Sequence, residues 1–403
     1  MALANRLQSD TGLMAAEAYE TLPAWIYNNA EFYRLEREHV FKRHWQFAGH
    51  VCEVPRPGDY LTLSVMGLRL LVLRGEDGAL RAFHNVCRHR AAKLLSGGEG
   101  HCERFIECRY HGWTYHLDGR LRTVPAEGSF EGLDREQFGL KAIELEQFLG
   151  LVFVRVERGG PSLAEIFAPY RAELEDYRIP EMICIGERFF ADRGVDWKIV
   201  IDNYLEGYHV PVAHPGLFRL FGKKYEVEVR PHGLARALHW LQDKPSSVWS
   251  ERAYQALLPE VAHLPRERRR AWAYYSLFPN VAFDLFPETL GHFHVIPTAP
   301  GRSVLRYRTY GHADKGRALH AVRWLSRRIN GQIDAEDVDV TKRVQAGLES
   351  GGYETGLLSK HEICVKRFHD AIRRAIPVAR LRRAPAPGTV VERNRELASG
   401  LMS

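Results

Sequence analysis

Four side chains that bind metals stand in two short boxes, and they limit the fold more than any other feature of the chain. The first box is Cys87-Arg-His89 and the second is Cys108-Arg-Tyr-His111. Two thiolates can hold one iron of a [2Fe–2S] cluster while two imidazoles hold the other, and the neutral imidazoles raise the reduction potential. Zinc is the chemical alternative, because it also binds Cys and His at short spacing. Either metal needs two loops held by a rigid frame.

A second group of polar residues follows later in the chain. Asn203, Glu206 and His209 are spaced so that a helix places them on roughly one face. His214 would lie about 140° from His209 on a regular helix. Pro211 disfavours helix at the residue before it, and we expect a turn there to return His214 to the side of His209. Two histidines and a carboxylate bind non-haem Fe(II) and leave positions open for oxygen and substrate. The alternative is a helix and loop with two incidental histidines.

The third ligand of such an iron site is expected from a later acidic run. Its carboxylates are Asp334, Glu336, Asp337 and Asp339, at the start of a helical pattern. Acidic residues also suit the start of a helix because they favour its dipole, so the residue pattern alone leaves the choice among them open.

The cluster boxes resemble a known domain. The run from Cys108 to Gly119 contains Cys-X-Tyr-His-Gly-Trp and a closing Asp-Gly turn. These are hallmarks of the Rieske domain in the α subunits of Rieske non-haem iron oxygenases, the ring-hydroxylating family. The chain departs from the family at Ala91, where Gly is frequent, and in a slightly longer gap between the boxes. The resemblance implies that the four boxed side chains, which are Cys87, His89, Cys108 and His111, bind a [2Fe–2S] Rieske cluster.

The second group resembles the catalytic motif of the same family. The resemblance implies that His209 and His214 bind mononuclear Fe(II) and that Glu206 bridges them to the cluster of a neighbouring subunit. Asp337, in a Glu-Asp pair ahead of Val-Gln-X-Gly-Leu-X-Ser, is implied as the third ligand, with Asp334 and Asp339 as the alternatives. Asn203 orients ligands or substrate, or else it serves as a helix cap. Glu instead of Asp at the bridge resembles the subgroup that oxidises carnitine, glycine betaine, choline and stachydrine.

The hydrophobic pattern predicts an α+β protein of two domains. We expect a β-rich Rieske domain over residues 45–157 and, after a Gly-Gly-Pro linker, a catalytic domain over residues 163–376. In the catalytic domain, helices should cover one face of an antiparallel sheet, and the resemblance implies a helix-grip (START-like) fold. A helical segment over residues 1–44 is expected to pack on the catalytic domain. Residues 377–403 are expected to form a basic flexible tail.

Particular elements are also expected. Strands are predicted at 61–65, 68–73, 274–278, 281–286, 290–296 and 303–309, and helices at 17–43, at 315–348 with an interruption near Gly331, and at 359–375. His292 and His294 alternate along one strand and should point to one face of the sheet. We interpret them as pocket lining or sheet surface rather than as metal ligands.

Composition narrows the function. The chain of 403 residues has 45% apolar residues and a net charge of +6, without a membrane-length apolar run or a signal-peptide pattern at its start. Six cysteines, two of them assigned to the cluster, suit a reducing cytoplasm. The basic charge lacks a nucleic-acid-reading motif, so neither nucleic acid nor membrane is an expected partner.

The chain also lacks a Gly-X-Gly-X-X-Gly fingerprint for a nicotinamide or flavin cofactor. A separate NAD(P)H-dependent reductase with flavin and iron–sulfur groups is therefore expected, with or without a ferredoxin, and the family implies a homotrimer. The expected function is that of a terminal oxygenase that hydroxylates or demethylates a small organic substrate such as a quaternary ammonium compound. Cis-dihydroxylation or O-demethylation of an aromatic compound is the alternative.

Overall fold

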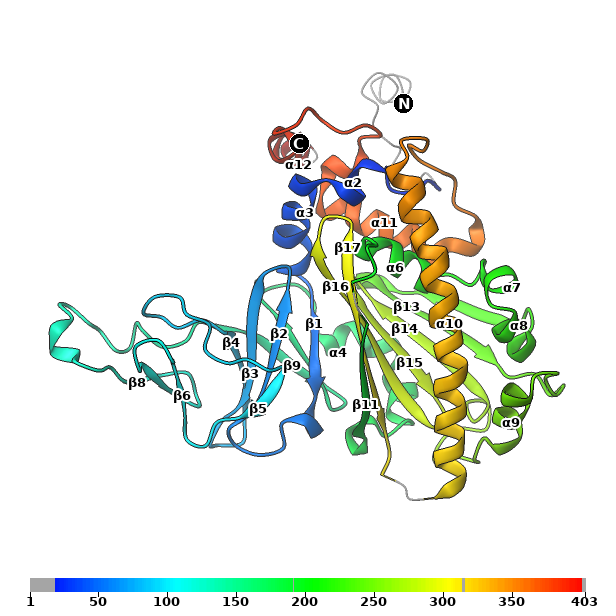
Figure 1. Ribbon diagram of the computed structural model, residues 1–403, viewed down its shortest axis with the longest axis horizontal. Coiled ribbons are helices and arrows are strands. Elements are labelled where there is room, and N and C mark those ends of the chain that lie inside the picture. The colour runs from blue at the N-terminus through cyan, green and yellow to red at the C-terminus, as the bar shows by residue number, and fades with distance from the viewer. Residues whose placement is uncertain (1–18, 191, 314–315, 401–403) are drawn as a thin grey trace. The chain divides into compact units, whose positions relative to one another are not determined.

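The protein was analysed as a computed structural model, which describes residues 19–190, 192–313 and 316–400 (Figure 1). The chain divides into two compact units. One unit, called the β unit here, spans Lys42–Cys184. The other, called the α+β unit, combines Met1–Phe41 with Ile185–Ser403. The expected α+β class is confirmed, and the strands of both units pair in antiparallel fashion.

The β unit contains a seven-stranded sheet in the order β1-β10-β9-β4-β3-β2-β5 and a three-stranded sheet in the order β6-β7-β8. Its strands are β1 (Gln46–His50), β2 (Asp59–Val65), β3 (Leu68–Arg74), β4 (Leu80–His84), β5 (Glu99–His101), β6 (Phe105–Glu107), β7 (Thr114–His116), β8 (Leu121–Thr123), β9 (Ala142–Phe148) and β10 (Leu151–Arg155). The first cluster box lies in the loop between β4 and β5, and the second lies in the loop between β6 and β7. The expected sheet frame therefore carries both boxes on loops.

The β unit continues past the Gly-Gly-Pro linker, where the sequence predicts a domain boundary. Helices α4 (Leu163–Phe167) and α5 (Arg171–Glu175) belong to it. The ring of Phe167 stacks on Phe148 of β9 at 4.9 Å between centroids, and the Leu163 N–H donates to the Glu146 carboxylate at 2.7 Å. A short amphipathic helix that follows a turn can bury its apolar face on the preceding sheet, so the composition of the linker did not mark the boundary.

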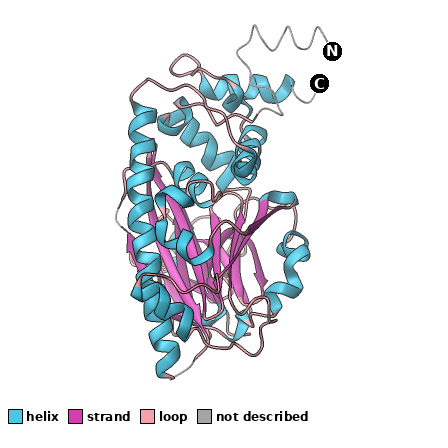
Figure 2. Cartoon of the chain, turned by 90° about the vertical axis from the view of Figure 1, so that its right-hand side faces the viewer, coloured by secondary structure: helices cyan, strands magenta, loops and turns pink. Residues whose placement is uncertain are grey.

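The α+β unit has a seven-stranded sheet in the order β11-β17-β16-β15-β14-β13-β12, with helices lying across it (Figures 1 and 2). Its strands are β11 (Ile183–Phe190), β12 (Tyr225–Val229), β13 (Leu234–Trp240), β14 (Ala271–Leu277), β15 (Val281–Phe286), β16 (Thr289–Ala299) and β17 (Arg302–Gly311). Its larger helices are α6 (Trp197–Tyr204), α8 (Pro215–Phe221), α9 (Trp249–Leu257), α10 (Arg317–Glu349) and α11 (Ile363–Ala375), and the short α7 (Val210–Ala213) precedes α8. None of the described helices is long and apolar enough to cross a membrane.

Helix α10 runs unbroken through Gly331, so the expected interruption is wrong. A glycine inside a helix costs only about 1 kcal/mol relative to alanine. The helix buries Val322, Leu325 and Ile329 in the hydrophobic core, and this packing outweighs the local preference. Lys315, where the sequence predicts the helix to begin, lies outside the described residues.

The N-terminal segment contains α2 (Trp25–Asn28), α3 (Ala30–Glu36) and a π-helical turn (Arg37–Phe41). The buried ammonium group of Lys198 on α6 contacts the Glu36 carboxylate at 2.6 Å. The ring of Phe41 packs edge-on against Trp197 at 5.0 Å. The described part of this segment thus packs within the α+β unit, while residues 1–18 lie outside the described residues.

The described part of the C-terminal segment is ordered, contrary to the expected flexible tail. A 3-10 turn covers Pro377–Arg380, and α12 covers Val390–Gly400. Val378 and Val390 are fully buried. The Glu31 carboxylate accepts the backbone N–H groups of Gly388 and Val390. Buried apolar residues and several carboxylates, among them Glu31, hold the segment in place even though its composition is basic. Residues 401–403 lie outside the described residues.

Candidate functional site

The two cluster boxes adopt the same backbone loop. In each box the cysteine N–H donates to the carbonyl five residues later, at 2.8 Å for both Cys87 and Cys108. The cysteine carbonyl accepts the N–H four residues later, at 3.1 Å in the first box and 3.0 Å in the second. The residue that donates this N–H is left-handed in both loops, with a φ of 57° at Ala91 and 68° at Gly112. Ala91 therefore occupies a position where glycine has the lower conformational cost.

The four boxed side chains fit an iron–sulfur cluster. Cys87 and Cys108 are buried free thiols, and the rings of His89 and His111 lie 4.6 Å apart between centroids. The Nδ1 atom of His89 is buried and has no hydrogen-bond partner among residues 19–190, 192–313 and 316–400. A buried ring nitrogen without a partner is unusual in a protein and suits a metal ligand. Burial and the neighbouring Cys87 thiol raise the pKa of the Cys108 thiol, and a metal would overcome this by binding the thiolate.

Aromatic residues support these loops. The Trp113 ring stacks on His89 at 4.9 Å between centroids. The Tyr115 hydroxyl lies 3.2 Å from the Cys87 sulfur and accepts the Arg88 backbone N–H at 2.9 Å. Burial and Cys87 raise the pKa of Tyr115, so its proton remains available for donation to a thiolate. No sequence pattern predicted a role for Tyr115, although its place two residues after Trp113, within β7, puts it close to the second box.

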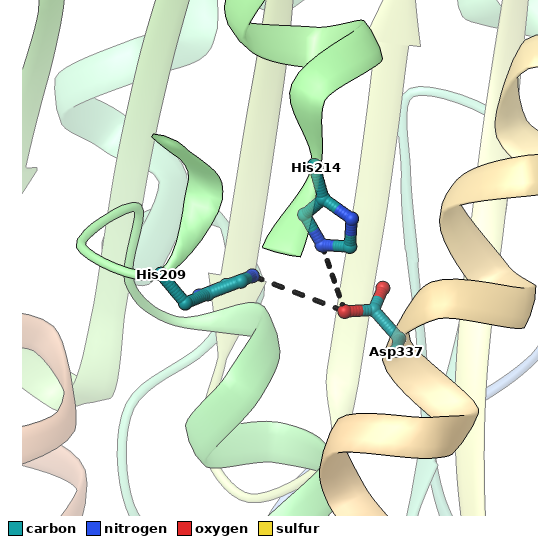
Figure 3. Close-up of side chains that lie close together, drawn as sticks. All are labelled: His209, His214 and Asp337. Atoms are coloured by element: carbon teal, nitrogen blue, oxygen red, sulfur yellow. Dashed lines mark hydrogen bonds and ion pairs between the residues drawn. The ribbon is translucent and has the colours of Figure 1, made fainter. Parts of the chain in front are cut away.

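His209, His214 and Asp337 come together in the α+β unit (Figure 3). One ligand atom from each lies within 4.8 Å of the others. The Oδ1 atom of Asp337 is 2.9 Å from Nε2 of His214 and 3.8 Å from Nε2 of His209. The histidines flank α7 and the carboxylate projects from α10. A facial set of two imidazoles and one carboxylate fits Fe(II) with open coordination positions.

The helix that leads to this group ends earlier than the sequence predicts. α6 stops at Tyr204, so Asn203 lies in the helix while Glu206 and His209 lie in the turn after it. The Glu206 carboxylate accepts the backbone N–H groups of Tyr208 and His209. Glu206 therefore shapes the turn that presents His209, much as a side chain caps the start of a helix.

The turn before His214 was predicted at Pro211, but the structure places it at Pro215. Pro211 lies in the first turn of α7, where a helix does not need the missing N–H, so it does not break the chain. The break falls at His214, which has φ −121° and ψ 70° and precedes Pro215. A proline disfavours helical geometry in the residue before it. Pro215 therefore turns the chain at His214 and places its imidazole beside His209.

Each imidazole has its own carboxylate partner on Nδ1. Glu206 contacts Nδ1 of His209, and Glu336 contacts Nδ1 of His214 at 2.8 Å. A proton held on Nδ1 leaves Nε2 free for a metal. Burial lowers the pKa of His214, but its hydrogen bonds to Asp337 and Glu336 outweigh burial and raise the pKa overall. Asn203 Nδ2 donates to Asp337 Oδ1 at 2.6 Å, so this side chain orients the carboxylate.

The other candidate residues lie outside this group. Asp334 pairs with Arg193, and Asp339 pairs with Arg343 at 2.8 Å on the exposed side of α10. His292 and His294 are buried on one face of β16, opposite to the face that carries Phe293. Since Phe293 stacks on Tyr204 of α6, the two histidines point away from the face that α6 covers.

Two family models match the chain. The Rieske [2Fe-2S] domain matches residues 44–144, and the ring hydroxylating alpha subunit (catalytic domain) matches residues 183–377. The β unit is thus an iron–sulfur domain joined in one chain to an iron-dependent catalytic domain. The chain belongs to the family of Rieske non-haem iron oxygenases, whose cofactors are a [2Fe–2S] cluster and a mononuclear non-haem iron.

Curated relatives have related names. The carnitine monooxygenase oxygenase subunit of Acinetobacter pittii is 33% identical over 197 residues, which are 49% of this chain and 53% of that protein. The glycine betaine monooxygenase oxygenase subunit of Chromohalobacter salexigens is 34% identical over 49% of this chain and 44% of its own. The chloroplastic choline monooxygenase of Beta vulgaris is 27% identical over 83% of this chain and 72% of its own. In the first two comparisons the chain spans about half the length of the relative.

Solved structures share the fold. A quaternary ammonium Rieske monooxygenase in complex with L-carnitine has a TM-score of 0.74 at 22% identity, covering 90% of this chain and 99% of that one. Naphthalene 1,2-dioxygenase from Rhodococcus sp. bound to indole has a TM-score of 0.73 at 21% identity, covering 91% and 95%. A quaternary ammonium monooxygenase and a naphthalene dioxygenase resemble this chain to a similar degree, so the fold alone does not indicate the substrate.

Proposed function

We propose that the chain is the terminal oxygenase of a multicomponent system. It would take electrons from a separate NAD(P)H-dependent reductase, with or without a ferredoxin, and use O2 to hydroxylate or demethylate a small organic substrate. The observation that carries this proposal is the grouping of His209, His214 and Asp337 in the same chain as a Rieske domain. Bound to these three residues, Fe(II) would supply the activation of oxygen.

The residues around the iron ligands would prepare the site. Glu206 and Glu336 hold the Nδ1 protons of the two histidines and so direct Nε2 toward the metal. Asn203 holds one oxygen of Asp337 and limits its rotation. In the β unit, Cys87, His89, Cys108 and His111 would hold the cluster, and the electron would leave through a histidine edge.

We propose further that the protein is a homotrimer in which the cluster of one copy serves the iron of its neighbour through Glu206. Exposed apolar side chains beside both ligand sets support this arrangement. Tyr208 is 61% and Val212 is 89% exposed next to His209. Tyr110 is 56% exposed and stacks on His111 at 3.7 Å. Such side chains at a reaction centre suit burial by another copy.

Mixed trimers test this route. Copies with Cys108→Ser lack the cluster, and copies with His209→Ala lack the mononuclear site, so each alone should be inactive. Two different affinity tags would isolate trimers that contain both variants. Restored turnover in those trimers supports transfer between subunits. If mixed trimers stay inactive although one kind of copy holds the cluster and the other holds mononuclear iron, transfer between subunits is ruled out.

For the substrate, we propose a quaternary ammonium compound. The names of the relatives and the glutamate at position 206 support this class. Aromatic hydroxylation is the second candidate because naphthalene 1,2-dioxygenase shares the fold. The six free cysteines suit a reducing cytoplasm as the place of action.

The first experiment is metal and sulfide analysis of anaerobically purified protein, followed by oxygen uptake. About three irons and two sulfides per chain are expected, with the EPR signal of a reduced Rieske cluster. Oxygen uptake would then be measured with a generic reductase on betaines and on aromatic acids. Uptake with betaines alone supports the proposed class, and uptake with aromatic acids alone supports the second candidate. Zinc without sulfide would contradict the oxygenase proposal.

A further inference from the structure

Asp284 of β15 is a buried carboxylate without a cation. It is 7% exposed and accepts the hydroxyl groups of Tyr204 at 2.9 Å and Tyr307 at 3.3 Å. No Lys, Arg or His in residues 19–190, 192–313 and 316–400 forms an ion pair with it. Burial raises the pKa of Asp284 to about 6, and the two hydroxyls offset only part of that cost. A buried carboxylate without an opposite charge is costly, so its retention needs a reason.

Two other buried carboxylates of the α+β unit pair with cations. Glu36 pairs with Lys198 at 2.6 Å, and Asp370 pairs with Lys366 at 2.7 Å. Asp284 differs because its hydrogen-bond partners are the neutral hydroxyl groups of Tyr204 and Tyr307. A cation that the chain does not itself supply would complete the site electrostatically.

Aromatic rings surround this carboxylate on the sheet face that α6 covers. Tyr274 of β14 lies directly opposite Asp284 in the sheet register. The Tyr204 ring stacks on Phe293 at 5.5 Å and meets the Tyr274 ring edge-on at 6.2 Å. Tyr204, Tyr274, Phe293 and Tyr307 are only half-buried, although a helix lies over this face. Each of these rings therefore keeps some solvent-accessible surface.

A glycine allows one of these rings to reach the carboxylate. Gly291 of β16 pairs with Asp284, and a Cβ atom at Gly291 would lie 1.9 Å from the Tyr307 hydroxyl. Any side chain at Gly291 would therefore displace Tyr307 from Asp284. The contact between Tyr307 and Asp284 therefore requires glycine at position 291.

The aromatic group adjoins the proposed iron site. Burial raises the pKa of Tyr274, and the negative charges of Asp284 and Asp337 raise it further, so both carboxylates lie in the neighbourhood of its hydroxyl. Tyr204 also directly follows Asn203, whose amide bonds Asp337. A cation held by Asp284 would thus have its substituents close to His209, His214 and Asp337.

Building on the proposed oxygenase function, we propose that Asp284 binds the ammonium group of a cationic substrate, with aromatic rings around it. The rings are those of Tyr204, Tyr274, Phe293 and Tyr307. The carboxylate supplies the opposite charge, and aromatic faces attract quaternary ammonium groups. A neutral aromatic substrate has no use for a buried carboxylate at this place. Asp284 is therefore the residue that would select cations over hydrocarbons.

Glu288 offers a matched control. It is also buried and accepts the hydroxyl of Tyr254, at 3.1 Å and 3.2 Å to its two oxygens. Unlike Asp284, it feels the positive charge of Arg323. It lies in the turn between β15 and β16, against the first part of α10. Its role is explained within the chain, so a neutral substitution there should leave ligand binding unchanged.

The test is calorimetric titration of the holoenzyme, anaerobic and without reductant, so that binding is separate from turnover. The probes are choline, glycine betaine, L-carnitine and 3,3-dimethylbutan-1-ol, the neutral carbon isostere of choline. Asp284→Asn should weaken binding of the cations about tenfold or more and change binding of the neutral alcohol less than about twofold. Glu288→Gln should leave all affinities unchanged. Cluster absorbance and iron content would verify that each variant is intact.

A second variant guards against misfolding of the first. Tyr274→Leu keeps Asp284 and removes one aromatic face, and it should weaken the cations more than the neutral alcohol. The proposal is overturned if the wild-type protein binds none of the cations. It is also overturned if Asp284→Asn binds cations as tightly as the wild type, or loses cation and alcohol equally, since Asp284 would then only tie α6 to the sheet.

The outcomes separate this inference from the proposed function. Cation binding that depends on Asp284, without oxygen uptake on any substrate, would contradict the oxygenase proposal and leave the binding site standing. Oxygen uptake on aromatic acids without any cation binding would support the oxygenase proposal and contradict the cation site at Asp284.

Discussion

The proposed cluster ligands come from residues 87–111 and occupy two copies of one hydrogen-bonded loop, whereas the residues grouped in the α+β unit come from positions 209, 214 and 337. In the first case backbone bonds within each box set the geometry. In the second case a turn, a proline and a distant helix must each be in place. The first kind of site can be recognised from a short string of residues, and the second depends on the assembled fold.

The two sites also differ in what surrounds the ligands. The Tyr115 hydroxyl lies near the Cys87 sulfur, while side-chain carboxylates contact His209 and His214. Hydrogen bonds to sulfur tune a reduction potential, and carboxylates on imidazoles tune metal affinity. Substitutions around the two sites should therefore change different measured quantities.

The largest expected effect is selective loss of one metal. His209→Ala should remove about one iron per chain and all turnover but keep the cluster spectrum, because the cluster ligands lie in other loops. Cys108→Ala should remove the cluster and keep mononuclear iron. Iron and sulfide analysis with EPR measures both. Loss of both metals in either variant would show that the two sites do not form independently.

Next in size is the contrast between the two carboxylates. Glu206→Gln should keep both metals and lower turnover about 100-fold, because the amide retains an acceptor for Nδ1 but loses the charge. Glu336→Ala should lower Fe(II) affinity about 10- to 100-fold, measured by competition with a chelator. Glu336→Gln, which keeps an acceptor, is the control and should retain most of that affinity. Equal effects of Glu206→Gln and Glu336→Gln on turnover would contradict a special role of Glu206 in turnover.

A smaller effect is expected at the cluster. Tyr115→Phe removes the hydroxyl 3.2 Å from the Cys87 sulfur. A hydrogen bond to a charged acceptor is worth about 1.5 kcal/mol, or roughly 60 mV for one electron. The reduction potential should fall by that order with the cluster intact, as followed by potentiometric EPR. An unchanged potential would mean that the hydroxyl serves the Arg88 N–H alone.

The smallest effect concerns the left-handed position shared by the two loops. Ala91→Gly should stabilise the β unit by up to about 1 kcal/mol, because glycine adopts a positive φ without a steric cost. Gly112→Ala should destabilise it by at least about 1 kcal/mol, since the added Cβ would lie 3.2 Å from Pro125. The temperature at which the cluster absorbance is lost measures both. Opposite shifts are expected, and shifts of the same sign would break the equivalence of the two loops.

Much of the architecture was readable from local pattern. The strands predicted at 61–65, 68–73, 281–286, 290–296 and 303–309 lie within β2, β3, β15, β16 and β17. Apolar residues that alternate with polar ones match the two-residue period of a strand, so this pattern predicts a strand from local sequence alone. Predictions differed from the structure where packing between segments far apart in the chain set the conformation. Examples are Gly331 inside α10, the C-terminal helix α12, and helices α4 and α5, which belong to the β unit.

The second coordination site shows the same division at the level of single residues. The pairing of Glu336 with His214 joins positions 122 residues apart, and the bond between Tyr204 and Asp284 spans 80. Neither pairing has a local signal. Pro215 did have one, since a proline constrains the residue before it, and it would have located the turn at His214 better than Pro211 did.

By itself the sequence determined the cluster boxes, the α+β class and the two histidines of the second site, because spacing and periodicity are local properties that the backbone obeys wherever it folds. Only the tertiary structure decided which of four acidic residues faces both histidines, which carboxylate supports each imidazole, and that Asp284 is buried without an ion-pair partner. These depend on contacts between segments far apart in the chain, where the packing of helix against sheet sets the distances that govern charge and metal binding.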